Sequence, residues 1–209
     1  VFEFRGGLEE WAAQGHTVTQ SEAAPAEPMI ANGRYALDLG ESSVTWIGRN
    51  LINKHWGQVA ISSGHVDIRD GLPVSGEAVL DLRRITASDL AGDALHDVLI
   101  HHLESDDFFD VARFPEAQFR FDQAERCHDR PGCCNLRLQG QLTLRGVTQS
   151  LTIEAAAGVA PEGKAALQAS FAIDRTKWGV LYGSGRFFRR LAGHLVNDSI
   201  ELQLRILTA

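Results

Sequence analysis

The sequence predicts an all-β protein, an antiparallel barrel of about eight strands with one helical insertion. Apolar and polar residues alternate along eight or nine short segments, and turns containing Gly, Asp or Pro separate these segments. Only residues 87–105 change to the apolar period of a helix. One helix among many antiparallel strands is typical of a barrel or curled sheet. At about eight strands, such a barrel either fills with side chains or leaves room for one ligand.

The alternation is clearest in two segments. NLRLQGQLTLRG (135–146) and SIELQLRI (199–206) each place leucine or isoleucine on one face and polar residues on the other. This pattern predicts strands with one buried and one solvated face. Such inward positions can form a packed core or line a cavity, and alternation alone does not separate these alternatives. The predicted inward residues are Trp46, Phe119, Phe121, Leu136, Leu138, Leu142, Phe171, Ile173, Ile200 and Leu202.

Residues 87–105 predict a single helix. Ser88 is a suitable N-cap, and Asp89 lies in the first turn, where the helix dipole favours an acid. Helical spacing places the buried stripe at Leu95, Val98, Leu99 and His102.

The end of this helix carries a dense polar cluster, HHLESDD (101–107). His and carboxylate side chains can bind zinc, which makes His101, His102, Asp106 and Asp107 candidate ligands. Neighbouring residues on a helix, however, point about 100° apart, and no HExxH spacing is present. The alternative is a helix C-terminus that favours His, followed by a turn with aromatic residues. We adopt this structural interpretation and assign no metal site.

Composition excludes several classes of protein. The chain has 209 residues and a formal charge of −7, which argues against a nucleic-acid-binding protein. No apolar run approaches the roughly 20 residues that span a bilayer. No GxSxG elbow or cysteine nucleophile motif is present. The sequence therefore predicts a binding module rather than an enzyme, and it implies no cofactor.

The first part of the chain has a different character. LEEWAAQG (8–15) predicts a two-turn helix that ends at Gly15. SEAAPAEPMIANG (21–33) has the composition of a linker, rich in Ala, Pro and Glu. We place a domain boundary near residue 33.

The three cysteines cluster in CHDRPGCC (127–134), a predicted hairpin loop. Three states are open: a zinc or copper site that includes His128, a disulfide between Cys127 and Cys133, or free thiols. The vicinal pair Cys133 and Cys134 fits one metal tetrahedron awkwardly, so free thiols are the expected state.

Four segments spread along the chain resemble the YceI-like family, whose members are lipocalin-like barrels that bind polyisoprenoid lipids. The first is HLESDDFFDVARFPEAQFRF, residues 102–121. The others are LQGQLTLRGVTQSLTIEA (138–155), FAIDRTKWGV (171–180) and LVNDSIELQLRI (195–206). The resemblance implies a narrow apolar tunnel for an isoprenoid chain, of the quinone or polyprenyl phosphate type, held for carriage or sequestration.

The resemblance also implies site residues. Phe108 and Phe109 would anchor the insertion to the barrel at the ligand. Arg175 would bind the head group, with Arg186 or Lys177 nearby and Trp178 in the same stretch. His55 and His102 have two alternative roles: a shared polar role at one end of the barrel, or a purely structural role. The implied ligand-binding set is Trp46, His55, His102, Phe108, Phe109, Phe119, Phe121, Leu138, Leu142, Phe171, Ile173, Arg175 and Trp178.

Residues 1–19 resemble the end of a rhodanese-like domain, on Gly6, Gly7, Leu8, Trp11 and Gly15. The resemblance implies a remnant of such a domain at 1–19, a linker at 20–33 and a YceI-like barrel at 34–209, with any sulfurtransferase centre upstream. Two alternative functions follow: an accessory module of a rhodanese fusion, or a His/Cys metal-binding protein. We expect a cytoplasmic rather than a periplasmic location, and a homodimer is conceivable.

Overall fold

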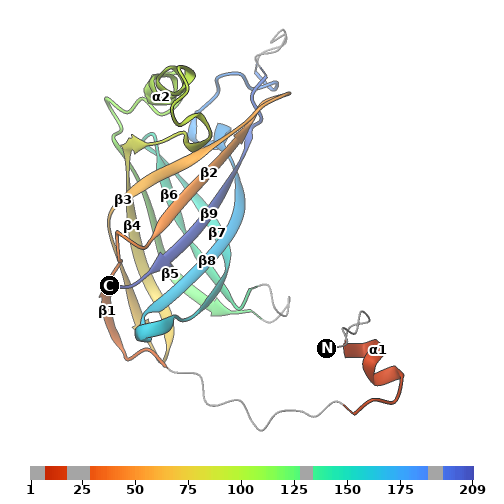
Figure 1. Ribbon diagram of the computed structural model, residues 1–209. Helices are drawn as coiled ribbons and strands as arrows, with labels where there is room; N and C mark the ends of the chain where they lie inside the picture. Colours follow the sequence, from red (N-terminus) through yellow and green to blue (C-terminus); the bar gives the residue numbers. More distant parts are fainter. Residues whose placement is uncertain (1–7, 18–28, 128–133, 188–194) are drawn as a thin grey trace.

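The computed structural model describes residues 8–17, 29–127, 134–187 and 195–209. In these residues, nine strands alternate with short helical segments (Figure 1). The strands are β1 (Gly33–Ala36), β2 (Ser43–Arg49), β3 (Lys54–Arg69), β4 (Leu72–Ile85), β5 (Glu116–Arg126), β6 (Leu136–Leu144), β7 (Val147–Val159), β8 (Ala165–Asp174) and β9 (Ser199–Leu207).

Eight of the described strands close into an antiparallel barrel, which confirms the predicted fold class. The order β3-β2-β9-β8-β7-β6-β5-β4 closes because β4 also pairs with β3. The remaining strand, β1, pairs with residues 65–68 of β3, while β2 pairs with residues 54–59 of the same strand. Both therefore lie on one side of the long strand β3. Closure leaves no free edge in the ring, so the backbone groups of all eight strands have neighbours.

The burial of the strands follows the alternation in the sequence. Leu136, Leu138, Leu142 and Leu144 of β6 are buried, and the alternate residues of β9 line the interior. The outer faces carry the polar residues, such as Gln141 and Gln203. The predicted one-sided strands are therefore confirmed.

The helical insertion differs from the prediction. It consists of a short 3-10 turn, η1 (Ser88–Leu90), and a separate helix, α2 (Leu95–Glu104). Gly92, with φ +83°, lies between them and interrupts the helical backbone. Ser88 is therefore not the N-cap; Ala94 occupies that position in α2, and Asp93 accepts a hydrogen bond from the backbone N–H of Leu95.

The buried face of α2 also differs. Leu95 and Val98 are 60% and 63% exposed, whereas Leu103 is buried and Leu99 is half-buried. The helix lies over one end of the barrel in Figure 1. The helix starts at Leu95, and only its second half reaches the barrel. Of the predicted stripe, Leu99 and His102 line the interior at this end, whereas Leu95 and Val98 do not.

The expected helix near the N-terminus is present as α1 (Leu8–Ala13), and Gly15 follows it with φ +79°. Gly6 and Gly7 of the rhodanese-like match, residues 20–28 of the expected linker, and His128 and Cys133 of the hairpin loop lie outside the described residues. None of the described helices has the length and apolar character that crossing a membrane requires.

Candidate ligand-binding site

An apolar cavity runs through the interior of the barrel. It consists of two chambers of about 250 Å³ and about 350 Å³. We call the chamber at the α2 end the upper chamber and the other the lower chamber. Val44, Leu80, Leu142 and Leu202 line both chambers, so these four residues form a waist between them. The interior therefore contains two apolar chambers, with the buried side chains of Val44 and Leu142 packed between them.

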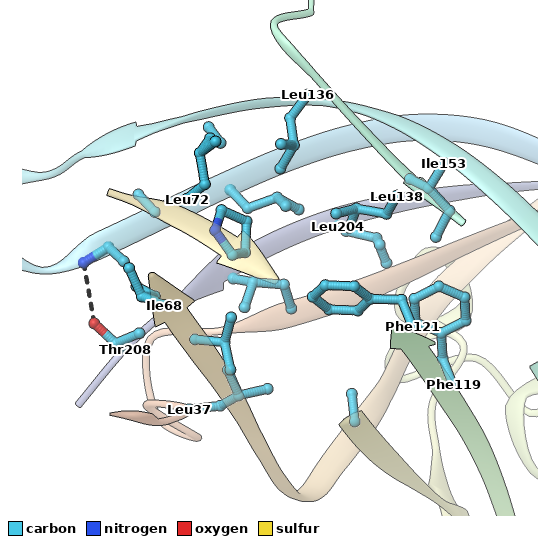
Figure 2. Close-up of a pocket in the computed structure, with 18 of the residues that line it drawn as sticks. Leu37, Ile68, Leu72, Phe119, Phe121, Leu136, Leu138, Ile153, Leu204 and Thr208 are labelled. Carbon is cyan, nitrogen blue, oxygen red and sulfur yellow. Dashed lines mark hydrogen bonds between the residues drawn. The ribbon is translucent and has the colours of Figure 1, made fainter. Parts of the chain in front are cut away.

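The lower chamber is lined by aliphatic and aromatic side chains (Figure 2). Phe119 and Phe121 stack with ring centroids 6.3 Å apart, and Phe171 lines the same chamber. All three point inward yet keep accessible surface, because the space in front of them is empty. Thr208 contributes a hydroxyl, which accepts a hydrogen bond from the backbone N–H of Ala165 at 3.0 Å. The lining of the lower chamber is mainly apolar, but it also includes His65, Glu77, Arg126 and Asn135.

The upper chamber combines apolar walls with polar groups. Trp46, Ile173, Phe108 and Phe109 line it. The Trp46 indole N–H donates to the Thr86 carbonyl at 3.0 Å, which fixes the ring against the chain that leaves β4. His55, His102, Arg175 and Tyr182 supply polar atoms to the same chamber. The polar groups of the upper chamber therefore include a buried guanidinium, that of Arg175.

His102 lies within an aromatic cluster. Its ring meets Tyr182 edge-on at 4.5 Å and Phe108 at 4.9 Å, and Nε2 lies 3.3 Å from the Asp107 carboxylate. These contacts connect α2 with the loop that carries Tyr182. His101, by contrast, is exposed and its Nδ1 lies 2.7 Å from the Asp97 carbonyl. The two neighbouring histidines thus face different surroundings, as the helix geometry predicts.

His55 lines the same chamber from β3. Its Nδ1 lies 2.8 Å from one oxygen of Asp89, and the other oxygen accepts the backbone N–H of Trp56 at 2.8 Å. Asp89 therefore ties η1 to β3 and orients the imidazole of His55.

Arg175 is 3% exposed. Its guanidinium donates to the backbone carbonyls of Asn197, Val180 and Val196 at 3.0, 2.7 and 3.1 Å, and it lies 5.9 Å from the Phe108 ring centroid. Burial lowers the pKa of this guanidinium. The Arg175 guanidinium therefore lines the chamber and also connects the segments that contain Val180 and Val196.

The other residues of that stretch lie elsewhere. Arg186 pairs with Asp174 and Asp198, at 2.8 and 3.1 Å. Lys177 is exposed. Trp178 is 2% exposed and does not line either chamber; its indole N–H donates to the Leu142 carbonyl at 3.0 Å. Trp178 thus packs in the wall behind the cavity.

The structure brings the remaining sequence-predicted residues together around one cavity. It also adds Val44, Leu80 and Tyr182, which sequence reasoning did not single out. Val44 and Leu80 lie in alternating strands and could have been found by extending the pattern. Tyr182 lies in a loop without regular period, so no sequence signal marks its side chain as inward.

The metal interpretation of the polar clusters gains no support. Among the described residues, no three His, Cys, Asp or Glu side chains are grouped as metal ligands would be. Cys127 is buried and is a free thiol, and Cys134 Sγ lies 3.8 Å from a Glu154 carboxylate oxygen. Cys133, the other half of the disulfide considered above, lies outside the described residues, so free thiols stay a prediction for this cluster.

A closed antiparallel barrel with a long apolar cavity defines a lipocalin-like ligand-binding barrel. In a comparison with protein families, the family model of the YceI-like domain matches residues 35–207 of the sequence. The chain therefore belongs to the YceI-like family.

Solved structures share the fold. BcnA from Burkholderia cenocepacia has 16% identity and a TM-score of 0.65, over 83% of this chain and 99% of that one. A polyisoprenoid-binding domain from Saccharophagus degradans has 12% identity and a TM-score of 0.62, over 83% and 97%. The Campylobacter jejuni YceI protein has 15% identity and a TM-score of 0.53, over 100% and 99%. No curated protein matches the sequence.

Proposed function

We propose that the barrel binds a long isoprenoid lipid, of the quinone or polyprenyl phosphate type, for carriage or sequestration. The observation that carries this proposal is the pair of apolar chambers inside the barrel, which share four aliphatic lining residues. A flexible, slender apolar chain, such as an isoprenoid with its small methyl branches, could pass between these side chains, whereas a bulky rigid ligand could not. Each buried CH₂ contributes about 0.8 kcal/mol, so a tail that occupies both chambers supplies ample affinity.

The polarity of the cavity suggests an orientation for the lipid. The polar residues that line the lower chamber, His65, Glu77, Arg126 and Asn135, are half-buried or exposed, and the Thr208 hydroxyl already accepts a hydrogen bond, so this chamber has no buried cation like Arg175. The upper chamber contains His55, His102, Arg175 and Tyr182. We therefore place the tail in the lower chamber and the head group in the upper chamber, where a quinone carbonyl or a phosphate would find hydrogen-bond donors. The name of the Saccharophagus degradans neighbour, a polyisoprenoid-binding domain, supports this class of ligand.

Three further parts of the sequence interpretation are also proposals. The rhodanese-like segment would make this chain part of a fusion protein. We further propose a cytoplasmic location and a homodimer. These features do not alter what the cavity itself binds.

The first experiment is solvent extraction of freshly purified protein, followed by mass spectrometry. We expect a prenyl quinone or polyprenyl phosphate in stoichiometric amount. An extract free of prenyl lipid, together with failure to take up a polyprenol offered in detergent, would contradict the proposal.

A variant at the waist tests the tunnel directly. Leu202 lines both chambers, so Leu202→Phe adds a ring at the constriction. We expect this variant to lose most binding of a long polyprenol but to retain binding of farnesol, because one chamber suffices for the short chain. Gln203→Phe is the matched control, since it adds the same ring on the exposed face of the same strand. Equal binding of the long polyprenol by both variants would mean that the tail does not pass the waist.

A further inference from the structure

The hairpin between β2 and β3, residues 49–54, presents two aliphatic side chains to solvent at the α2 end of the barrel. Leu51 is 70% exposed, and Ile52 is 82% exposed. Ile52 is the most exposed large hydrophobic residue in the described part of the chain. Met29, Leu95 and Val98 are exposed as well, at 76%, 60% and 63%, but in this hairpin two such residues are adjacent in the sequence.

The turn itself does not need these side chains. Asn50 N donates to the Asn53 carbonyl at 2.9 Å, and the Asn50 side-chain oxygen accepts the N–H groups of Ile52 and Asn53 at 3.0 and 2.6 Å. Asparagine thus fixes the turn, as is common. Leu51 and Ile52 occupy the two central positions, where small or polar residues usually stand. Their side chains therefore contribute nothing to the turn that a polar residue could not.

The charge around the tip is locally positive in a chain of net charge −7. Arg49 and Lys54 flank the tip on either strand and are exposed. Glu201 neutralises part of this charge, since it lies 3.4 Å from Arg49. Trp56, 40% exposed, follows two residues after Lys54. An interfacial membrane contact typically combines aliphatic residues at a tip with flanking cations and an adjacent tryptophan, and this hairpin has all three.

The tip also borders the cavity. Arg49, Asn50 and His55 of this hairpin line the upper chamber. Asn50 forms a bridge with Val196, whose N–H donates to the Gly183 carbonyl, so the hairpin adjoins the loop that carries Phe187. Phe187 is a further exposed apolar residue, at 54%. The exposed apolar residues therefore lie beside the chamber in which we place the lipid head group.

We propose that this hairpin docks the upper end of the barrel on an anionic lipid bilayer, so that the isoprenoid enters from the membrane. The inference rests on the proposed function, because a membrane-dissolved cargo is what makes a bilayer the occupant of this surface. Leu51 and Ile52 insert among the acyl chains at the interface, while Arg49 and Lys54 remain at the level of the phosphates. A protein partner or a second copy would equally cover apolar residues, but neither explains the flanking cations beside a lipid cavity.

The test is flotation of the purified protein with vesicles of phosphatidylcholine alone and with vesicles that also contain phosphatidylglycerol. We expect stronger binding to the second kind. Leu51→Asp combined with Ile52→Asp should weaken this binding at least about tenfold, since burial of one such side chain contributes about 1.5–3 kcal/mol and tenfold corresponds to about 1.4 kcal/mol. Lys54→Glu should reduce the preference for phosphatidylglycerol.

Leu39→Asp is the matched control, because Leu39 is 48% exposed in a loop outside this hairpin. The proposal is wrong if wild type does not float, if the double variant floats like wild type, or if the control loses binding equally. A dimer in solution that the double variant disrupts would assign the surface to a second copy instead.

The membrane-docking proposal and the lipid-binding proposal can be tested separately. Binding of polyprenol offered in detergent measures binding to the cavity in the absence of a membrane. The double variant should bind it like wild type, which also shows that the barrel is folded. Vesicle binding without polyprenol binding would overturn the proposed function and leave the docking surface in place.

Discussion

At the residue scale, Arg175 shows how one side chain can serve the fold and the cavity together. Its three backbone carbonyl partners come from the segments at 180 and 196–197, which lie outside the named strands and helices. Asp198 lies 3.6 Å from it, and one buried oxygen of this carboxylate has no hydrogen-bond partner. A charged guanidinium is therefore held at the head-group end of the chamber by the loops it organises. Its contact with a lipid head group remains a prediction.

Asp67 provides a pH-dependent prediction at the same scale. Arg34 of β1 donates to both oxygens of this β3 carboxylate, at 2.7 and 2.8 Å. The hydrogen bonds from Arg34, and then from Ser75, hold the pKa of Asp67 far below its usual range. Because the folded pKa lies below the unfolded value of about 3.9, the ionised carboxylate stabilises the folded state above that pH. This contribution is lost as the pH falls through the folded pKa.

We therefore expect Asp67→Asn to lower the thermal midpoint at neutral pH, with a difference from wild type that shrinks at acid pH below about 4. Thermal unfolding followed by circular dichroism across this range measures it. Asp122→Asn, at an exposed position of β5, controls for the loss of one negative charge. A deficit that stays constant down to the most acid condition would show that the salt bridge is not its source.

At the element scale, the join between β3 and the chain leaving β4 depends on Gly57. A Cβ at this position would lie 1.8 Å from the Thr86 carbonyl oxygen, which is backbone and cannot rotate away. The same carbonyl accepts the Trp46 indole N–H. A side chain at position 57 would therefore displace the segment that also positions Trp46 in the upper chamber.

Gly57→Ala should destabilise the protein by about 3 kcal/mol, the upper part of the usual range for overpacking. Gly158→Ala is the matched control in β7, because a Cβ there meets nothing within 4 Å. It should be neutral or slightly stabilising, since Ala restricts the unfolded chain. Urea unfolding of both variants gives the comparison. Similar stabilities would indicate that the β3–β4 join accommodates a methyl group.

The elements also show where sequence reasoning stops. The strands and their inward faces follow from a period of two, which is a local property of the chain. The apolar period of residues 87–105 correctly predicted a helical segment between β4 and β5. Gly92, however, divides this segment into η1 and α2, and Leu95 and Val98 of α2 are exposed to solvent. A helical period predicts which residues share one face of the helix. It does not predict how much of that face packs against the barrel.

At the scale of the whole molecule, an occupied cavity should stabilise the barrel. A ligand that binds only the folded state adds about 2.7 kcal/mol at one hundred times its dissociation constant. We expect delipidated protein to melt at a lower temperature than freshly purified protein, and a long polyprenol to restore the midpoint. Differential scanning calorimetry measures both, with a straight-chain alkane as the control ligand. Identical midpoints before and after delipidation would imply that nothing fills the cavity of the purified protein.

Alternation along the chain predicted the strands and placed Phe119, Phe121, Leu138 and Leu142 on the inner face, and the order of the motifs indicated the family and, through it, the barrel. Alternation alone left a barrel and a curled sheet open, and the pairing of β3 with β4 closes the ring. The two interior chambers follow from the three-dimensional packing, since they depend on whether the inward side chains together fill a ring of eight strands. This packing also set Trp178 behind the wall and brought Tyr182 to His102, because contacts across loops depend on where distant strands end.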